Sequence, residues 1–261
     1  MDREIFKDAV MVITGGGSGM GAAMALEFSR CGACVAIFDL DDQKGKSVEE
    51  CIVQAGNKAI YKKVDVTNKC MVKTCSDEIE KEFGNITHWI NSAGVSKMKP
   101  FLECDEALWD VTLDVNLKAT FLCCQVAIEK MVSYGKGVIL NMSSLSGKKA
   151  SSWQTIYCAS KFGVQGLSQA IAKEFADQNI RVNTICPGIV QTEMWDKLKF
   201  EYAQKRNIDP EEVMPYFKKN IPMHRLVDLQ DVLYAATYLL SEQSSYLTGQ
   251  SINLVGGEWM D

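Results

Sequence analysis

The sequence lacks the features of nucleic-acid-binding and membrane proteins. Its 28 Lys and Arg against 33 Asp and Glu give a net charge of −5, with no basic stripe for a phosphate backbone. The first ten residues, MDREIFKDAV, are charged and contain no apolar signal segment, and we see no apolar run of membrane-spanning length. We therefore expect no nucleic-acid partner, no membrane association and a cytoplasmic location.

Histidine is scarce, and the cysteines form no pattern. The two histidines are His88 and His224, too few to complete a zinc site with the C-x-x-C pair Cys31 and Cys34. That pair falls where we expect a helix to end and a strand to begin, whereas a thioredoxin-like motif begins a helix. The ten cysteines show no even framework in a chain too long to need disulfides. We expect no metal site, and reduced thiols that act mostly as small buried apolar groups.

The chain also lacks a linker, a low-complexity tract or an internal repeat, so we expect one domain over 1–261. Short apolar runs alternate with amphipathic segments such as 70–83, where apolar residues recur every fourth position. This alternation predicts an α/β fold, a doubly wound parallel sheet of about seven strands with helices on both faces and its ligand at the carboxyl edge. The expected strands are 9–14, 34–38, 58–64, 88–91, 137–142, 181–186 and 251–255.

One segment interrupts this alternation. Residues 193–224 are charged, contain several Met and aromatic residues, and include Pro210, Pro215 and Pro222. An excursion after a late strand, above the ligand edge, predicts a substrate lid.

A glycine-rich turn, TGGGSGMG, follows the first expected strand. Gly15, Gly19 and Gly21 permit a tight turn, and the next helix, from about Met20, would point its positive N-terminus at a phosphate. A flexible loop could have the same glycine-rich sequence. However, Asp39 ends the second expected strand 18 residues after Gly21, and an acidic residue at this position is typical of dinucleotide-binding sites.

Asp39 also indicates which dinucleotide binds. A carboxylate there accepts hydrogen bonds from ribose hydroxyls and repels a 2′-phosphate, and neither Leu40 nor Ser18 supplies a compensating cation. We therefore expect NAD rather than NADP. The alternative role, a helix N-cap, is more natural for Asp41 or Asp42.

Tyr157 and Lys161 are four residues apart in an expected helix, and therefore share a face. The spacing occurs by chance in chains of this size. It would also suit an acid–base pair in which the nearby cation lowers the pKa of the phenol.

Several short motifs fall in one order along nearly the whole chain. They are TGxxxGxG at 14–21, DV at 65–66, NSAG at 91–94, Asn116, NMSS at 141–144, Tyr157-x-x-x-Lys161 and PGIVQT at 187–192. Together they resemble the short-chain dehydrogenase/reductase family, which implies a Rossmann-type fold and a nicotinamide cofactor. Ser92 departs from the pattern, since many members have a second Asn there.

The resemblance implies roles for individual residues. Tyr157 would be the general acid/base, Lys161 would lower its pKa and hold the nicotinamide ribose, and Ser144 rather than Ser143 would bind the substrate oxygen. Asn116 would anchor a water that links Lys161 to solvent; a satisfied helix-interior side chain is the alternative. The cofactor contacts would be Gly15, Ser18, Gly19, Met20, Gly21, Asp39, Leu40, Asp65, Val66, Asn91, Ala93, Gly94, Tyr157, Lys161, Pro187, Gly188, Ile189 and Thr192.

Parts of the C-terminal half are similar to bacterial sorbitol-6-phosphate 2-dehydrogenases, and the run 187–195 is similar to acetoin (butanediol) reductases. We expect a secondary alcohol or ketone on a small polar substrate, such as a sugar alcohol or its phosphate, contacted by Ser144, Tyr157 and Gln154. Trp195, Met194 and Trp153 would form walls of the pocket. Lys148 or Lys149 would bind a substrate anion, unless both are solvated surface lysines.

Other functions stay open at this point. They are a 3-oxoacyl-carrier reductase, which usually prefers NADP, a hydroxysteroid dehydrogenase, which would need an apolar pocket, and a non-catalytic NAD-binding or structural module. Family members are commonly oligomeric, and the apolar runs 119–128 and 163–171 fit the interfaces of a homotetramer or homodimer.

Overall fold

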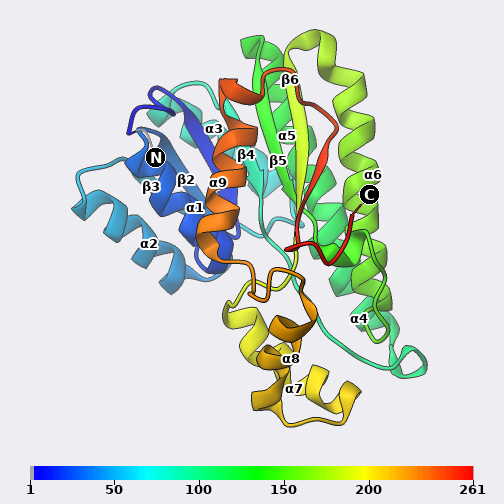
Figure 1. The fold of residues 1–261 in the computed structure, drawn as a ribbon. Coiled ribbons are helices and arrows are strands. Elements are labelled where there is room, and N and C mark those ends of the chain that lie inside the picture. The colour runs from blue at the N-terminus through cyan, green and yellow to red at the C-terminus, as the bar shows by residue number, and fades with distance from the viewer. Residues whose placement is uncertain (1–2, 261) are drawn as a thin grey trace.

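The computed structural model describes residues 3–260, which form one seven-stranded parallel sheet covered by helices (Figure 1). The strand order is β3-β2-β1-β4-β5-β6-β7, so the chain reverses its direction of travel between β1 and β4. Ligands of such sheets bind beyond the carboxyl ends of the strands at that reversal. The predicted fold class is confirmed. The strands are β1 (Val10–Thr14), β2 (Cys34–Asp39), β3 (Ala59–Lys63), β4 (His88–Asn91), β5 (Gly137–Met142), β6 (Ile180–Pro187) and β7 (Ser251–Leu254).

Helices bury both faces of the sheet because the strands are apolar on both sides. Along β1, Met11 and Ile13 pack against α1, α2 and α9, whereas Val10 and Val12 face α3, α5 and α6. The helices are α1 (Gly19–Arg30), α2 (Asp42–Gln54), α3 (Lys69–Phe83), α4 (Glu106–Leu113), α5 (Ala119–Tyr134), α6 (Thr155–Phe175), α7 (Glu193–Arg206), α8 (Val213–Asn220) and α9 (Leu229–Leu240).

Helices α4 and α5 are joined without a break by a π-turn, Asp114–Lys118. The combined helix, Glu106–Tyr134, contains an 18-residue window with a mean hydropathy of 1.3, half of it buried. By length and composition this helix could cross a membrane, which corrects the expectation that no apolar segment approaches that length. A helix that covers a sheet has the same composition, and Cys123, Val126 and Met131 are buried in the core.

The predicted excursion after β6 is a pair of helices, α7 and α8, which lie below the sheet in Figure 1, beyond the end of β6. They pack on a cluster that is separate from the two cores of the sheet. Its buried members are Met98, Leu198, Tyr202, Ala203 and Val213.

Candidate active site

A cavity of about 720 Å³ runs along the carboxyl edge of the sheet, from the ends of β2 and β3 to α7. It collects most of the predicted site residues, although they come from distant parts of the chain. Those that line it are Gly15, Ser18, Gly19, Met20, Asp39, Leu40, Asp65, Val66, Ala93, Gly94, Ser144, Gln154, Tyr157, Pro187, Gly188, Ile189, Thr192 and Trp195.

The glycine-rich turn is shaped for an anion. Gly15 and Gly19 adopt φ of +64° and +53°, the left-handed region that favours glycine. Ser18 precedes α1 without a side-chain capping bond, which leaves N–H groups of the first helical turn for a ligand. Gly21 lies outside the cavity, and a Cβ there would meet the Gly15 oxygen at 2.1 Å. Its lack of a side chain lets the turn pack on the helix, and its contact with the cofactor stays a prediction.

Asp39 is held rigidly at the adenine end of the cavity. Its Oδ2 accepts a hydrogen bond from the Gly17 N–H at 2.8 Å, and its Oδ1 accepts one from the Asp41 N–H at 2.9 Å. Asp41, as predicted, is the N-cap of α2. The nearby cation Lys44 is ion-paired with Glu193 of α7. The Asp39 carboxylate lines the cavity, and among the described residues it forms no ion pair with Lys44.

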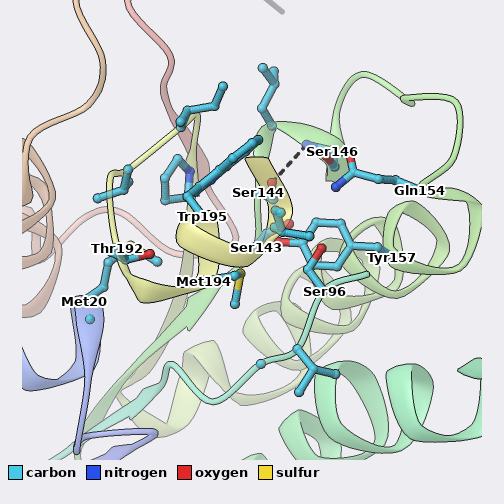
Figure 2. Close-up of a pocket in the computed structure, with 18 of the residues that line it drawn as sticks. Met20, Ser96, Ser143, Ser144, Ser146, Gln154, Tyr157, Thr192, Met194 and Trp195 are labelled. Atoms are coloured by element: carbon cyan, nitrogen blue, oxygen red, sulfur yellow. Dashed lines mark hydrogen bonds between the residues drawn. The ribbon is translucent and has the colours of Figure 1, made fainter. Parts of the chain in front are cut away.

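Tyr157 and Ser144 meet at the other end of the cavity, from α6 and the end of β5 (Figure 2). Burial raises the pKa of Tyr157 to about 12, and its hydrogen bond with Ser144 acts in the opposite direction. Ser144 Oγ also accepts from the Ser146 N–H at 3.1 Å. Ser143 instead donates to the Lys161 carbonyl at 2.8 Å, inside the protein. Ser144, not Ser143, therefore carries the hydroxyl that Tyr157 shares.

Burial raises the pKa of Tyr157 in this structure, so the lowering of that pKa by Lys161 stays a prediction. Lys161 Nζ donates to the Met142 carbonyl at 2.8 Å and lies 5.7 Å from the Tyr157 ring centroid, outside the cavity lining. Burial lowers the pKa of Lys161 to about 8. Desolvation therefore affects the pKa values of Tyr157 and Lys161 more than the attraction between the two residues does. Lys161 is held in place by its hydrogen bond to the end of β5.

Asn116 also lies just outside the lining, in the π-turn. Its Oδ1 accepts from the Val95 N–H at 2.8 Å, and its Nδ2 donates to the Val95 carbonyl at 2.9 Å and to Ser160 Oγ at 3.1 Å. A Cβ on Gly94 would lie 3.3 Å from Asn116 Oδ1 and 3.6 Å from Lys161 Nζ. Both side chains therefore stand directly behind Gly94, which lines the cavity. The water relay through Asn116 stays a prediction.

Asn91 does not line the cavity, and its contact with the cofactor stays a prediction. Its Nδ2 donates to Asn141 Oδ1 at 2.8 Å, and its Oδ1 accepts from Trp89 Nε1 at 2.9 Å. Asn141 in turn donates to Ser168 Oγ at 2.8 Å. This buried chain of hydrogen bonds ties the ends of β4 and β5 to α6, so Asn91 shapes the cavity from behind.

The substrate end has a polar wall and an apolar wall. Gln154 is buried on the polar wall, where Ser146 Oγ lies 3.5 Å from its Oε1. Met194 and Trp195 of α7 lie on the segment opposite in Figure 2. Trp153 is absent from the lining and packs in the cluster under α7.

Lys148 is also absent from the lining, whereas Lys149 is present. The short helical turn that follows Ser144 thus presents Lys149 to the cavity, and the role of Lys148 in binding a substrate anion stays a prediction.

Sequence reasoning missed several charged and aromatic residues of the cavity, namely Glu193, Tyr202, Lys205, Arg206 and Glu258. Three of them could have been found from the sequence, because Tyr202, Lys205 and Arg206 are spaced i, i+3, i+4 and therefore share one face of α7. Glu258 follows two consecutive glycines with positive φ, and the backbone direction after such a turn cannot be predicted from helix or strand periodicity in the sequence. Residues 3–260 contain no cluster of three or more His, Cys, Asp or Glu side chains suited to a metal.

Comparison with known proteins gives consistent matches over the whole cavity. The family model described as Enoyl-(Acyl carrier protein) reductase matches residues 15–258. D-threitol dehydrogenase of Mycolicibacterium smegmatis is 33% identical over 254 residues, 95% of this chain and 92% of that protein. The 3-oxoacyl-(acyl-carrier-protein) reductase of Chlamydia muridarum is 33% identical over 251 residues, covering 94% and 95%. The crystal structure of sorbitol-6-phosphate 2-dehydrogenase from Erwinia amylovora superposes with a TM-score of 0.93 at 34% identity, covering 97% and 100%.

Proposed function

The chain belongs to the short-chain dehydrogenase/reductase family, and we propose that it is an NAD(H)-dependent dehydrogenase of a small polyhydroxylated alcohol, a sugar alcohol or its phosphate. The family predicted from the motifs is confirmed, and with it the reaction class, oxidoreduction at a CH–OH group. The observation that carries the proposal is the convergence of Ser144, Tyr157 and Gln154 on the cavity that Asp39 closes at its far end.

The residues of the cavity fit a nicotinamide dinucleotide. The glycine turn and the first turn of α1 would hold the pyrophosphate, Asp39 the adenosine ribose, and Asp65 and Val66 the adenine. The cofactor, when bound, supplies the hydride acceptor or donor. Because the Asp39 carboxylate repels a 2′-phosphate and Lys44 is engaged by Glu193, we propose NAD rather than NADP.

Tyr157 exchanges the proton with the substrate oxygen. With a pKa of about 12 its hydroxyl is protonated at neutral pH, and can donate to a carbonyl oxygen during reduction. Ser144 stabilises negative charge on that oxygen. In the oxidative direction Tyr157 must first lose its proton, which the charged Lys161 behind it favours electrostatically. Lys161 is charged at neutral pH because its pKa is about 8.

The polar wall supports a substrate with several hydroxyl groups. Gln154, Ser146 and Ser96 offer hydrogen-bonding groups beside Ser144 and Tyr157, and buried groups of this kind reject substrates that leave them unpaired. D-threitol dehydrogenase and sorbitol-6-phosphate 2-dehydrogenase are named for such substrates.

A second candidate is the reduction of a more apolar ketone, in the manner of a 3-oxoacyl-carrier reductase or a hydroxysteroid dehydrogenase. The apolar wall of Met98, Met194 and Leu198 favours it, as does the name of the Chlamydia relative. Acetoin or diol reduction uses the same groups on a smaller substrate.

We also propose a homotetramer or homodimer in the cytoplasm. Exposed aromatic side chains lie on α4, α5 and α6, where Trp109, Phe121 and Phe162 are 48%, 42% and 47% exposed. The ten cysteines are all free thiols, which fits a reducing compartment.

The test is the absorbance of the reduced nicotinamide, followed with NAD and then NADP over a panel of polyols, polyol phosphates, vicinal diols, hydroxysteroids and 3-oxoacyl thioesters. We expect turnover of one polyol or polyol phosphate with NAD and none in Tyr157→Phe. Turnover only of hydroxysteroids or oxoacyl thioesters would establish the second candidate, and turnover only with NADP would overturn the role of Asp39.

A further inference from the structure

Three cationic side chains line the substrate end of the cavity: Lys149, Lys205 and Arg206. The carboxylate among them is Glu258, whose Oε1 lies 3.8 Å from Lys149 Nζ. Lys149 and Glu258 therefore largely cancel, and this end of the cavity keeps two positive charges, both from α7. The net charge is therefore positive in the part of the cavity into which a substrate bound at Tyr157 would extend.

Lys205 is held by two neutral oxygen atoms and by the Tyr202 ring, whose centroid lies 5.4 Å from its Nζ. Its Nζ donates to Ser151 Oγ at 3.0 Å and to the Ser152 carbonyl at 2.7 Å. Burial and the adjacent charge of Arg206 lower its pKa. Within residues 3–260, no carboxylate forms an ion pair with Lys205, although a desolvated ammonium is normally stabilised by one.

Arg206 is similarly placed by aromatic groups. Its Nε donates to the Tyr202 hydroxyl at 3.3 Å, and its guanidinium carbon lies 5.7 Å and 5.4 Å from the ring centroids of Tyr202 and Tyr216. No carboxylate in the described part of the chain pairs with it. Stacking of this kind fixes the plane of the guanidinium and leaves N–H donors for a ligand.

We propose that Lys205 and Arg206, with Lys149 at the rim, bind an anionic end group of the substrate, and that this group is a phosphate monoester. The inference rests on the proposed function, which supplies the reacting alcohol. Two uncompensated cations match the charge of a phosphate dianion better than that of a carboxylate or sulfonate. A compact ammonium beside a planar guanidinium also suits a tetrahedral group with three acceptor oxygens.

The anion site is coupled to the catalytic wall through Ser151 and Ser152. These serines belong to the loop that leads into α6, only a few residues before Gln154 and Tyr157. A phosphate bound by Lys205 would therefore fix the distance between the end of the substrate and the hydroxyl that reacts at Tyr157.

The experiment uses inorganic phosphate as the probe, with the protein saturated by NAD so that the glycine turn is blocked. Calorimetric titration would compare the wild type with Lys205→Met, Arg206→Met and Lys205→Arg. The matched control is Lys197→Met, an exposed lysine of the same helix that does not line the cavity. We expect each Met variant to weaken phosphate binding about tenfold, Lys205→Arg to retain most of it, and the control to change nothing.

The second arm measures kcat/KM for a polyol and its phosphate in the same variants. We expect the preference for the phosphorylated substrate to fall about tenfold in Lys205→Met and Arg206→Met. Unaltered phosphate binding in both Met variants would overturn the anion site. So would tight binding of acetate and methanesulfonate with none of phosphate. Normal phosphate binding with no turnover of any polyol would instead overturn the proposed function and leave the anion site standing.

Discussion

The two walls of the cavity are built in different ways. On the wall of β5 and α6, Ser143, Lys161 and Asn116 are buried, and they are hydrogen-bonded to the backbone of α6, of β5 and of the loop after β4, respectively. On the wall of α7 and α8, aromatic rings pack mainly on each other, as in the pairs Trp195–Phe217 and Tyr202–Phe217, with centroids 5.4 Å and 4.5 Å apart.

This difference separates the chemistry from the choice of substrate. The groups that handle the proton are fixed by the same core that holds the sheet together, so they cannot move without cost to folding. The groups of α7 that meet the far end of the substrate stand on a small cluster of their own, which can be repacked while the sheet stays intact. Substitutions on the two walls should therefore have effects of different kinds.

The largest effect should come from the catalytic wall. Tyr157→Phe removes the proton donor and should lower kcat by about a hundredfold to ten-thousandfold. Steady-state kinetics would measure the loss, and quenching of protein fluorescence by NADH should show that the cofactor still binds. A variant that keeps a tenth or more of the wild-type kcat would contradict the role given to Tyr157.

Asp39→Asn tests the far end of the cavity. The amide oxygen can still accept the Gly17 N–H, but the negative charge is gone, so the ratio of kcat/KM for NADP to that for NAD should rise about tenfold or more. Asp42→Asn is the matched control, since Asp42 lies outside the cavity and pairs with Lys46. An unchanged ratio in Asp39→Asn would show that cofactor choice lies elsewhere.

Lys161 should leave a signature in stability. Its pKa in the folded protein is about 8, below the ordinary 10.5, so the unfolded chain binds more protons between these values. The burial penalty is fully present below pH 8 and disappears as the pH rises toward 10.5. Relative to Lys161→Met, the wild type should therefore gain stability from pH 8 to pH 10. Urea denaturation of both proteins at the two pH values measures this, and a constant difference would refute the buried charge.

The smallest effect should come from the ion pair between Lys44 of α2 and Glu193 of α7, which joins α7 to the cofactor end of the cavity at the surface. Glu193→Gln should raise KM for the substrate less than about fivefold, because exposed ion pairs are weak and are screened by salt. A double-mutant cycle with Lys44→Met, at low and high salt, measures the coupling. A large, salt-independent coupling would mean that the lid is tied to the cofactor end more firmly than its packing indicates.

The sequence predicted the sheet, because buried parallel strands read as apolar runs, and each expected strand falls within about two residues of the observed one. It also predicted about half of the cavity lining, mainly from motifs tied to strand ends. It could not predict which groups stand behind the lining. Asn91 and Lys161 belong to hydrogen-bond networks that depend on three-dimensional proximity. Burial also raises the pKa of Tyr157, whereas the nearby Lys161 had suggested that this pKa would be lowered.

The segment 193–224 was predicted without its helices, and its role as a lid stays a prediction. Its hydropathy follows no clear helical period, since α7 divides its side chains among the cluster beneath it, the cavity and solvent. The spacing of Tyr202, Lys205 and Arg206 shows that they share a helix face, but only the fold shows that this face meets the cavity.

The π-turn at Asp114–Lys118 makes chain length itself a constraint. A π-turn holds one residue more than the α-helix around it, so deleting a single residue there would restore regular winding while the helix on either side keeps its orientation. Cys123 and Val126 would stay on the sheet, while Asn116 would lose its aim at Val95. The length of this stretch is therefore set by the direction of one side chain, whereas exposed positions of α4 such as Val111 should accept many side chains.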